Sequence, residues 1–141
     1  MGDSDRTFCM YVNHDSLTGH QIYLDTGTAT SKERFSTYKK SDNTFCVTDE
    51  SAGYCTSTTL SVNTDYDLCA VYDSSDSELR FYIDGVSDYN VTVSDMKTAK
   101  GSQNNIAVQE GCSWCNEMNG KLDEIMITAT AWTGEQIHDR S

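Results

Sequence analysis

Short runs of strand-forming residues, separated by polar turns, are the dominant pattern along the chain. In one run Leu79, Phe81 and Ile83 alternate with more polar residues, which places three apolar side chains on one face of a strand. The polar segment 73–77 separates this run from the one before it, and the two runs predict an antiparallel hairpin. Such runs recur at the short spacings typical of an all-β sandwich. The expected strands are 7–12, 21–24, 34–38, 44–48, 66–72, 79–85, 89–93, 105–108 and 121–128.

The last expected strand has apolar residues on both faces. Strict alternation along 121–128 places Ile125 and Ile127 on one face, and Leu122 and Met126 on the other.

A short helical turn is expected to close the chain. Thr133 is followed three residues later by Gln136, which is the pattern of a capping box. The full length of 141 residues is the size of one domain. We therefore expect a single domain over residues 1–141.

The charge of the chain excludes several classes of partner. Acidic residues outnumber basic ones 22 to 10, and the formal net charge is -12. A surface this negative repels nucleic-acid phosphates and anionic lipid headgroups, so neither is an expected partner. It attracts cations, and Ca²⁺ prefers the hard oxygens of carboxylates and carbonyls. No apolar run approaches the ~20 residues of a membrane span, so no membrane insertion is expected.

The six cysteines are an even and fairly high number for a chain of this length. They predict disulfides, and hence a secreted or cell-surface location in an oxidising compartment. Reduced thiols or a metal site are the alternatives. A structural zinc site usually has a second Cys pair or a spaced His pair, whereas the closely spaced pair Cys112 and Cys115 is far in sequence from His14, His20 and His138.

Three segments together resemble the pentraxins and the laminin-G-like domains. The segment 8–12 (FCMYV) resembles the strand that carries their "FT-x-C" motif. The segment 68–85, which ends in the letters DG, resembles their central hairpin. The segment 119–127 (NGKLDEIMI) resembles their C-terminal motif. The order and spacing of these segments extend the resemblance from Thr7 to Ile137.

The resemblance implies a fold of concanavalin A-like type. This is an all-β, two-sheet antiparallel jelly-roll sandwich, here with a short C-terminal helical turn. It also implies a disulfide between Cys9 and Cys69, which we expect to staple the two sheets together. The family usually has further strands before the "FT-x-C" strand, so those N-terminal strands are expected to be missing. The other four cysteines allow three pairings, of which we favour Cys46–Cys55 and Cys112–Cys115.

The resemblance further implies a calcium site at one rim of the sandwich. Pentraxins bind Ca²⁺ through an Asp-Asn pair in one loop and a Glu-rich loop before the last strand. Asp42, Asn43, Glu110 and Asn116 stand at corresponding positions and would supply oxygen ligands. The chain departs from the family at 111–112, where the next carboxylate is missing. The alternative is that Asp42 and Asn43 form only an Asx turn and that Glu110 is a solvated strand end.

Trp114 lies inside the loop between two cysteines. An exposed indole at this position would stack on a sugar or anchor a protein partner. The alternative is that it folds back onto the edge of the core. The ligand-binding residues that we expect are Trp114, Asp42 and Glu110.

No catalytic residue is expected. Glycoside hydrolases of this fold use paired carboxylates that share one strand face, whereas Asp123 and Glu124 are adjacent and point to opposite faces. No Gly-x-Ser-x-Gly nucleophile motif is present. We expect an extracellular, non-catalytic recognition module that binds a glycan or a protein ligand through rim loops, with Ca²⁺ as its cofactor. The alternatives are a structural module that forms homo-oligomers through an exposed sheet edge, and a polysaccharide-active enzyme.

Overall fold

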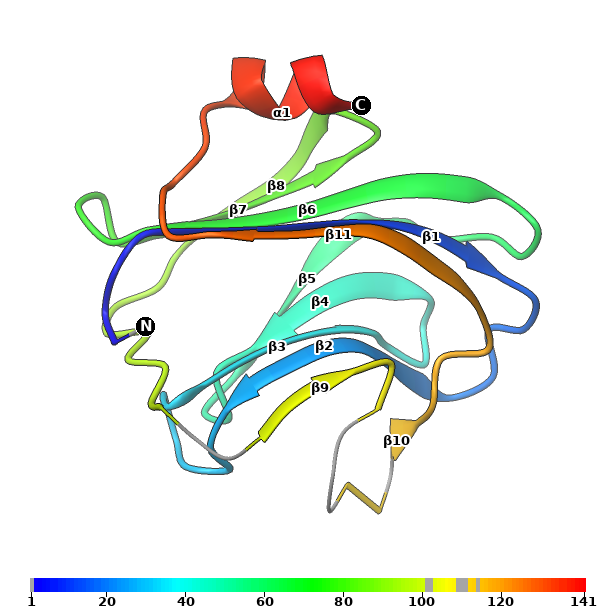
Figure 1. The fold of residues 1–141 in the computed structure, drawn as a ribbon, viewed down its shortest axis with the longest axis horizontal. Coiled ribbons are helices and arrows are strands. Elements are labelled where there is room, and N and C mark those ends of the chain that lie inside the picture. The colour runs from blue at the N-terminus through cyan, green and yellow to red at the C-terminus, as the bar shows by residue number, and fades with distance from the viewer. Residues whose placement is uncertain (1, 101–102, 109–111, 114) are drawn as a thin grey trace.

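Two β-sheets face each other in the computed structural model, which describes residues 2–100, 103–108, 112–113 and 115–141 (Figure 1). The five-stranded sheet has the order β11-β1-β6-β7-β8. The six-stranded sheet has the order β10-β2-β3-β4-β5, and β9 also pairs with β2. The predicted two-sheet sandwich is confirmed. The strands are β1 (Arg6–His14), β2 (His20–Gly27), β3 (Arg34–Lys39), β4 (Thr44–Thr48), β5 (Gly53–Thr59), β6 (Asp65–Asp73), β7 (Glu78–Ile83), β8 (Val86–Thr92), β9 (Gln103–Ile106), β10 (Cys115–Asn116) and β11 (Gly120–Thr128).

The core between the sheets is built from the apolar positions of the alternating strands. Leu79, Phe81 and Ile83 are all buried in it, as the sequence predicted. Phe8 of β1 meets Phe35 of β3 with ring centroids 4.6 Å apart, so aromatic contacts join one sheet to the other. Each such side chain contributes about 1.5–3 kcal/mol by its burial.

A β-bulge in β11 overturns the expected faces of that strand. Leu122 and Ile125 both pack against the core, although strict alternation places them on opposite faces. Glu124 has a φ of 46°, and the register between β1 and β11 shifts beside it. The extra residue of a bulge moves the following side chains to the other face. Met126 consequently lies on the outward face, beside the Cys9 disulfide.

Two strands of the six-stranded sheet were not expected from the sequence. β5 (GYCTSTT) is rich in Ser and Thr and is largely exposed at the sheet edge, so it lacks the apolar alternation of a buried strand. β10 is a two-residue strand that pairs with β2 in the parallel direction, whereas the other pairings between named strands in the described part of the chain are antiparallel.

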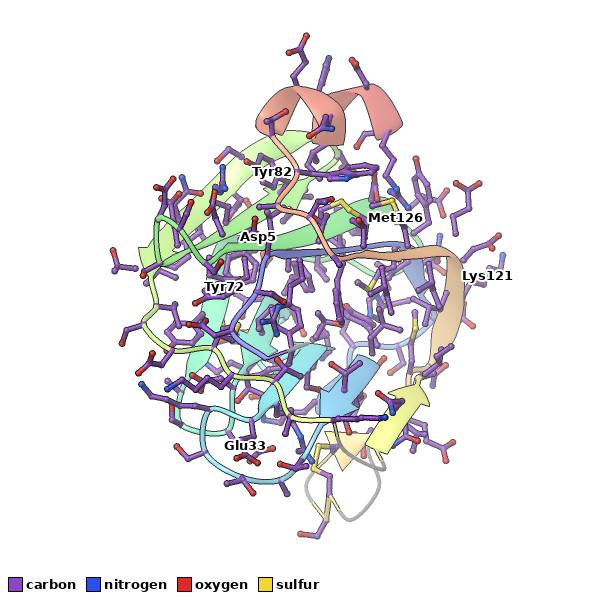
Figure 2. The ribbon with its side chains drawn as sticks, turned by 60° about the vertical axis from the view of Figure 1, so that its left-hand side comes forward. Asp5, Glu33, Tyr72, Tyr82, Lys121 and Met126 are labelled. Carbon is purple, nitrogen blue, oxygen red and sulfur yellow. A yellow bond between two sulfur atoms is a disulfide. The ribbon has the colours of Figure 1, made fainter. Side chains whose placement is uncertain are left out.

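The helix α1 (Gly134–Arg140) covers part of the outward face of the five-stranded sheet. The predicted capping box is present, since the Thr133 hydroxyl accepts a hydrogen bond from the Gln136 backbone and the Gln136 side chain reaches back to Thr133. Ile137 is buried against Tyr82, and Figure 2 shows Tyr82 and Met126 between the helix and the sheet. In the described part of the chain no helix has the length and apolar character of a membrane span.

Two of the three disulfides join neighbouring strands, and the third closes a short loop. Cys9 and Cys69 are cross-strand partners in β1 and β6, so their bridge lies within one sheet. The expectation that this bridge staples the two sheets together is therefore wrong. It lies on the outward face under α1, because the core positions of β1 are the residues on either side of Cys9. The structure also has the bridges Cys46–Cys55 and Cys112–Cys115.

Replacing both Cys9 and Cys69 by Ala is expected to lower the free energy of unfolding by about 4 kcal/mol, because the bridge spans a sequence separation of 60. The matched double replacement of Cys46 and Cys55 opens a separation of only 9 and should cost about 2.5 kcal/mol. Urea unfolding under non-reducing conditions measures both losses. A larger loss for the shorter loop would contradict the ranking.

Candidate functional site

The predicted metal ligands Asp42 and Asn43 form the tight turn between β3 and β4. The carboxylate of Asp42 lies 2.9 Å from the Lys40 ammonium and accepts a 2.6 Å hydrogen bond from the Thr44 hydroxyl. These two contacts lower the pKa of Asp42 to about 2. Asn43 has a φ of 68°, in the left-handed region that Asn tolerates. The pair forms an Asx turn in the structure.

The Lys39 ammonium lies directly beside this turn. Its side chain is fully buried and donates hydrogen bonds to the carbonyl oxygens of Leu17 and Gly19. It also donates to Oδ1 of Asn43 over 3.3 Å. One ammonium thus connects the segment between β1 and β2 with the turn between β3 and β4. We call the segment 17–19 and the turn 42–43 the rim.

Only part of the predicted calcium site meets at this rim. Asn116 reaches it from β10, where its Nδ2 donates to the carbonyl oxygen of Thr18 over 3.1 Å. Glu110 lies outside the described residues, and its role stays a prediction. The side-chain oxygens of Asp42 and Asn43 already accept from two ammonium groups, which would repel a dication. These contacts do not fit a calcium site, and among the described residues no group of three His, Cys, Asp or Glu could hold a metal ion.

Trp114, the predicted stacking residue, also lies outside the described residues. The cysteines on either side of it are bonded to each other, and Cys115 packs against Ile22 and Tyr38. This contact fixes the disulfide between Cys112 and Cys115 to the outward face of the six-stranded sheet. A role for Trp114 in binding stays a prediction.

The outward face of the six-stranded sheet also carries a buried ion pair. Nε of Arg34 lies 3.3 Å from a carboxylate oxygen of Asp25, and Glu50 pairs with Arg34 as well. Burial raises the pKa of Asp25, and the charge of Arg34 opposes the shift. Because Asp25 and Arg34 are almost fully buried, they offer no surface to a ligand.

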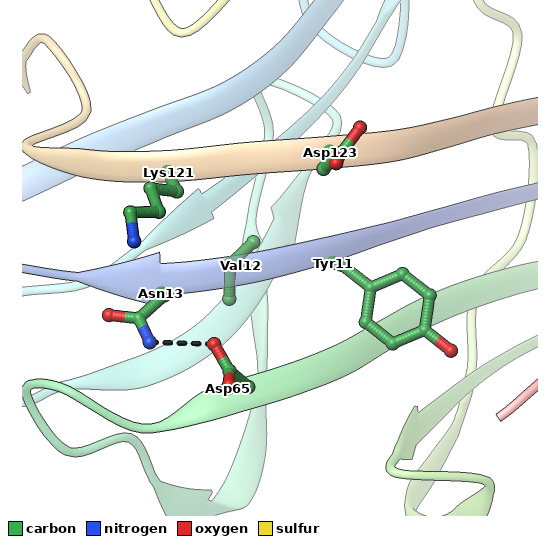
Figure 3. A pocket seen from close by; sticks show the side chains of 6 residues that line it. All are labelled: Tyr11, Val12, Asn13, Asp65, Lys121 and Asp123. Atoms are coloured by element: carbon green, nitrogen blue, oxygen red, sulfur yellow. Dashed lines mark hydrogen bonds between the residues drawn. The ribbon is translucent and has the colours of Figure 1, made fainter.

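A pocket of about 200 Å³ lies on the outward face of the five-stranded sheet, where β11, β1 and β6 are neighbours (Figure 3). Its lining combines an aromatic ring, an amide, an ammonium and two carboxylates, and most of these side chains are partly or fully exposed. The lining residues are Tyr11, Val12, Asn13, Asp65, Lys121 and Asp123.

The register of β1 brings these side chains together. Tyr11 is the cross-strand partner of Asp123, and Asn13 lies between Lys121 on β11 and Asp65 on β6. The amide nitrogen of Asn13 donates a 2.6 Å hydrogen bond to Asp65. The amide and this carboxylate are therefore already oriented, which lowers the entropy cost of binding a ligand.

A glycine at the start of β11 allows the close approach of the strands. Gly120 has a φ of 146°, and a Cβ at this position would lie 2.0 Å from the carbonyl oxygen of Asn13. Any other residue would push the strands apart. The glycine therefore sets Lys121 beside the pocket.

The terminal helix fixes the ring of Tyr11. The guanidinium of Arg140 stacks 4.9 Å from the ring centroid, and the Tyr11 hydroxyl donates to the Arg140 carbonyl oxygen over 3.3 Å. Arg140 in turn donates to a carboxylate oxygen of Asp67 and to the carbonyl oxygen of Glu124. The Tyr11 ring is held in place by these contacts, and the part of the ring that lines the pocket can contact a ligand.

Sequence reasoning did not find this pocket. The outward positions of β1, Tyr11 and Asn13, could have been noted from the alternation with buried residues. The pocket residues on β6 and β11 join them only through long-range strand register, for which a single sequence has no local signal.

A laminin-G family model, described as the concanavalin A-like lectin/glucanases superfamily, matches residues 1–138. The chain belongs to this family. The resemblance inferred from the sequence is thereby confirmed. No curated protein matches the chain.

Solved structures with the same fold include a pentraxin and two carbohydrate-bound domains. One is a heptameric SAP-like pentraxin from Limulus polyphemus (18% identity, TM-score 0.74, 96% of this chain and 68% of that chain). Another is domain 4 of AbnA, an extracellular arabinanase from Geobacillus stearothermophilus, in complex with arabinotriose (18% identity, TM-score 0.75, 98% of this chain and 66% of that chain). A third is the IT-sialidase CBM40 of Ruminococcus gnavus bound to α2,3 sialyllactose (12% identity, TM-score 0.76, 97% of this chain and 82% of that chain).

The fraction of each matched chain that this chain covers differs widely. This chain spans only 41% of a larger chain from Bacteroides ovatus, to which it is 17% identical with a TM-score of 0.83. At these identities the likeness shows the fold. The ligand must be argued from the chain's own residues.

The largest histidine contribution to the pH dependence of stability is expected from His14, which follows pocket residue Asn13. Its Nε2 lies 3.0 Å from the Tyr23 hydroxyl. Burial, and secondarily the charge of Lys39, lowers the pKa of His14 to about 4. The unfolded chain, with a His pKa of about 6.5, binds this proton more readily. Stability should therefore fall by about 3 kcal/mol as the pH drops from about 6.5 through about 4.

Urea unfolding at a series of pH values measures this loss. His14→Gln should flatten the slope within that window, whereas His138→Gln, at an exposed position on α1, should leave it unchanged. The slope from Asp42 lies lower, between about 3.8 and 2. An unaltered slope in His14→Gln would contradict this assignment.

Proposed function

We propose that this chain is a non-catalytic glycan-recognition module of an extracellular protein, and that the pocket on β1, β6 and β11 is its binding site. The observation that carries the proposal is the lining of that pocket. It presents a fixed aromatic ring beside oriented polar groups of both donor and acceptor type.

The chemistry of the lining suits a sugar. The apolar face of a sugar ring packs on an aromatic side chain such as Tyr11. Sugar hydroxyls donate to the carboxylates of Asp65 and Asp123 and accept from the ammonium of Lys121. At about 200 Å³ the pocket is smaller than the ~300–1,000 Å³ of drug-sized sites. It therefore suits one sugar unit or the end of a glycan chain.

The net charge narrows the class of glycan. At -12 the chain repels polyanions, and the pocket lining holds two carboxylates against one ammonium. A neutral glycan fits this balance better than a sulfated or uronic-acid polymer. Two similar structures, with arabinotriose and sialyllactose bound, support glycan binding as the class of function and leave the sugar to be measured.

The proposed extracellular location is supported by the three disulfides, because such bonds persist in oxidising compartments. A protein ligand remains the second partner that the pocket could take.

The sheet edges give less support to the alternative of a structural module that forms homo-oligomers through an exposed edge. The carboxylate of Asp88 on β8 accepts hydrogen bonds from the backbone of Ser57 and Thr58 on β5, which ties two edge strands of the sandwich together. At the opposite edge β11 has a bulge at Glu124 and charged side chains. Bulges and charges protect edges against pairing with another chain.

The enzymatic alternative has one observation in its favour. Asp65 and Asp123 line the same pocket, and glycoside hydrolysis uses two carboxylates that flank one bond. Asp65 accepts a hydrogen bond from Asn13, and a carboxylate oriented in this way could serve either to bind a ligand or to catalyse hydrolysis. Overnight incubation with neutral oligosaccharides separates the two roles, since released reducing sugar would contradict the non-catalytic proposal.

Binding to a glycan array, followed by calorimetry with the best oligosaccharide, tests the proposal. Asp65→Ala and Lys121→Ala should each weaken binding by about tenfold or more, because each removes a hydrogen-bonding charge from the pocket. The matched control Lys97→Ala removes an exposed lysine that does not line the pocket, and it should leave the affinity unchanged. Binding that is insensitive to both pocket variants would refute the site. No binding on the array would refute the function.

A further inference from the structure

We propose that the ammonium of Lys39 is the resident cation of the rim, and that it holds the segment 17–19 and the turn 42–43 together without calcium. The family resemblance implies a metal ion here, whereas the oxygens it assigns at Asp42 and Asn43 are bound by lysines. The inference does not depend on the glycan pocket.

The surroundings of Lys39 resemble those of a bound cation. The side chain is 0% exposed, and the oxygens around its ammonium are neutral: two backbone carbonyls and one side-chain amide. Backbone carbonyl and Asn oxygens are also common ligands of Ca²⁺. The cradle is therefore of a cation-binding type, and it is filled by a group that is covalently part of the chain.

One ammonium joins several parts of the chain. Leu17 and Gly19 belong to the connection between β1 and β2, and Asn43 belongs to the turn between β3 and β4. The carbonyl oxygen of Asn43 also accepts a 2.8 Å hydrogen bond from the backbone of Leu60. Without the ammonium, these partly buried acceptors would lose their donor, which is costly.

The rim is locally positive in an otherwise acidic chain. Burial, followed by the charge of Lys39, lowers the pKa of both His14 and His20. Lys40 adds a second ammonium, 2.9 Å from Asp42. A calcium ion at this position would have to approach two ammonium groups. The rim should therefore neither bind calcium nor need it.

Thermal unfolding of the whole chain in EDTA and in millimolar CaCl₂ tests this. The wild-type Tm should differ by less than about 1 °C between the two buffers, because only a ligand of the native state raises it. Lys39→Met should lower the Tm by about 8 °C or more. The matched control Lys40→Met removes only an exposed ion pair and should change it by less than about 2 °C.

Two results of this experiment would overturn the proposal. One is a wild-type Tm that rises in CaCl₂, with the rise abolished by Asp42→Ala. The other is a Lys39→Met variant that keeps the wild-type Tm.

A second variant tests the proposal even where Lys39→Met does not fold. Asn43→Asp replaces the amide oxygen 3.3 Å from the ammonium by a carboxylate, at a left-handed φ that Asp tolerates. With Lys39 as the resident cation, this change should raise the Tm in EDTA by about 2 °C or more. A lower Tm in EDTA that recovers in CaCl₂ would mean that the rim requires a metal ion, and would overturn the proposal.

Discussion

The register of β1 in the five-stranded sheet is the constraint on which the core, the first disulfide and the pocket all depend. Phe8 and Met10 point into the core, while Cys9 and Tyr11 point outward. A slip of one residue would exchange the two faces of the strand. It would move Phe8 out of the core and separate Cys9 from Cys69. The same alternation that packs the sandwich therefore also builds the pocket on its outside.

Buried cations organise the rest of this acidic chain. Arg6 is fully buried between the rings of Phe35 and Tyr72, 5.4 and 5.2 Å from their centroids, and donates to the carbonyl oxygen of Met96 over 3.0 Å. Burial lowers its pKa to about 10, so it remains charged at neutral pH. A buried charge is tolerated only where fixed partners compensate it. At Arg6, as at Lys39, those partners come from distant segments, and the cation joins them.

The alternation of apolar residues was sufficient to predict most strands. Residues 44–48 were expected as a strand and form β4 with the same bounds. β5 was missed because its exposed Ser and Thr residues satisfy strand geometry without an apolar pattern. The faces of β11 were assigned wrongly, because the bulge at Glu124 depends on its pairing with β1. Local chemistry thus predicts that a strand exists, and tertiary pairing decides its register.

The candidate metal site also shows a limit of prediction from sequence, because its chemistry depends on which charged groups lie beside it in the fold. The Asp-Asn pair at 42–43 carries the oxygen chemistry of a cation site, and the sequence alone allowed both a metal ligand and a turn. The proposal that the pair forms only a turn rests on two nearby lysines, Lys39 and Lys40, whose ammonium groups contact Asn43 and Asp42. A motif of oxygen ligands specifies a metal site only where the neighbouring charges leave those oxygens without a cation. On the proposal above, this chain supplies both the oxygen ligands and the ammonium groups that they bind.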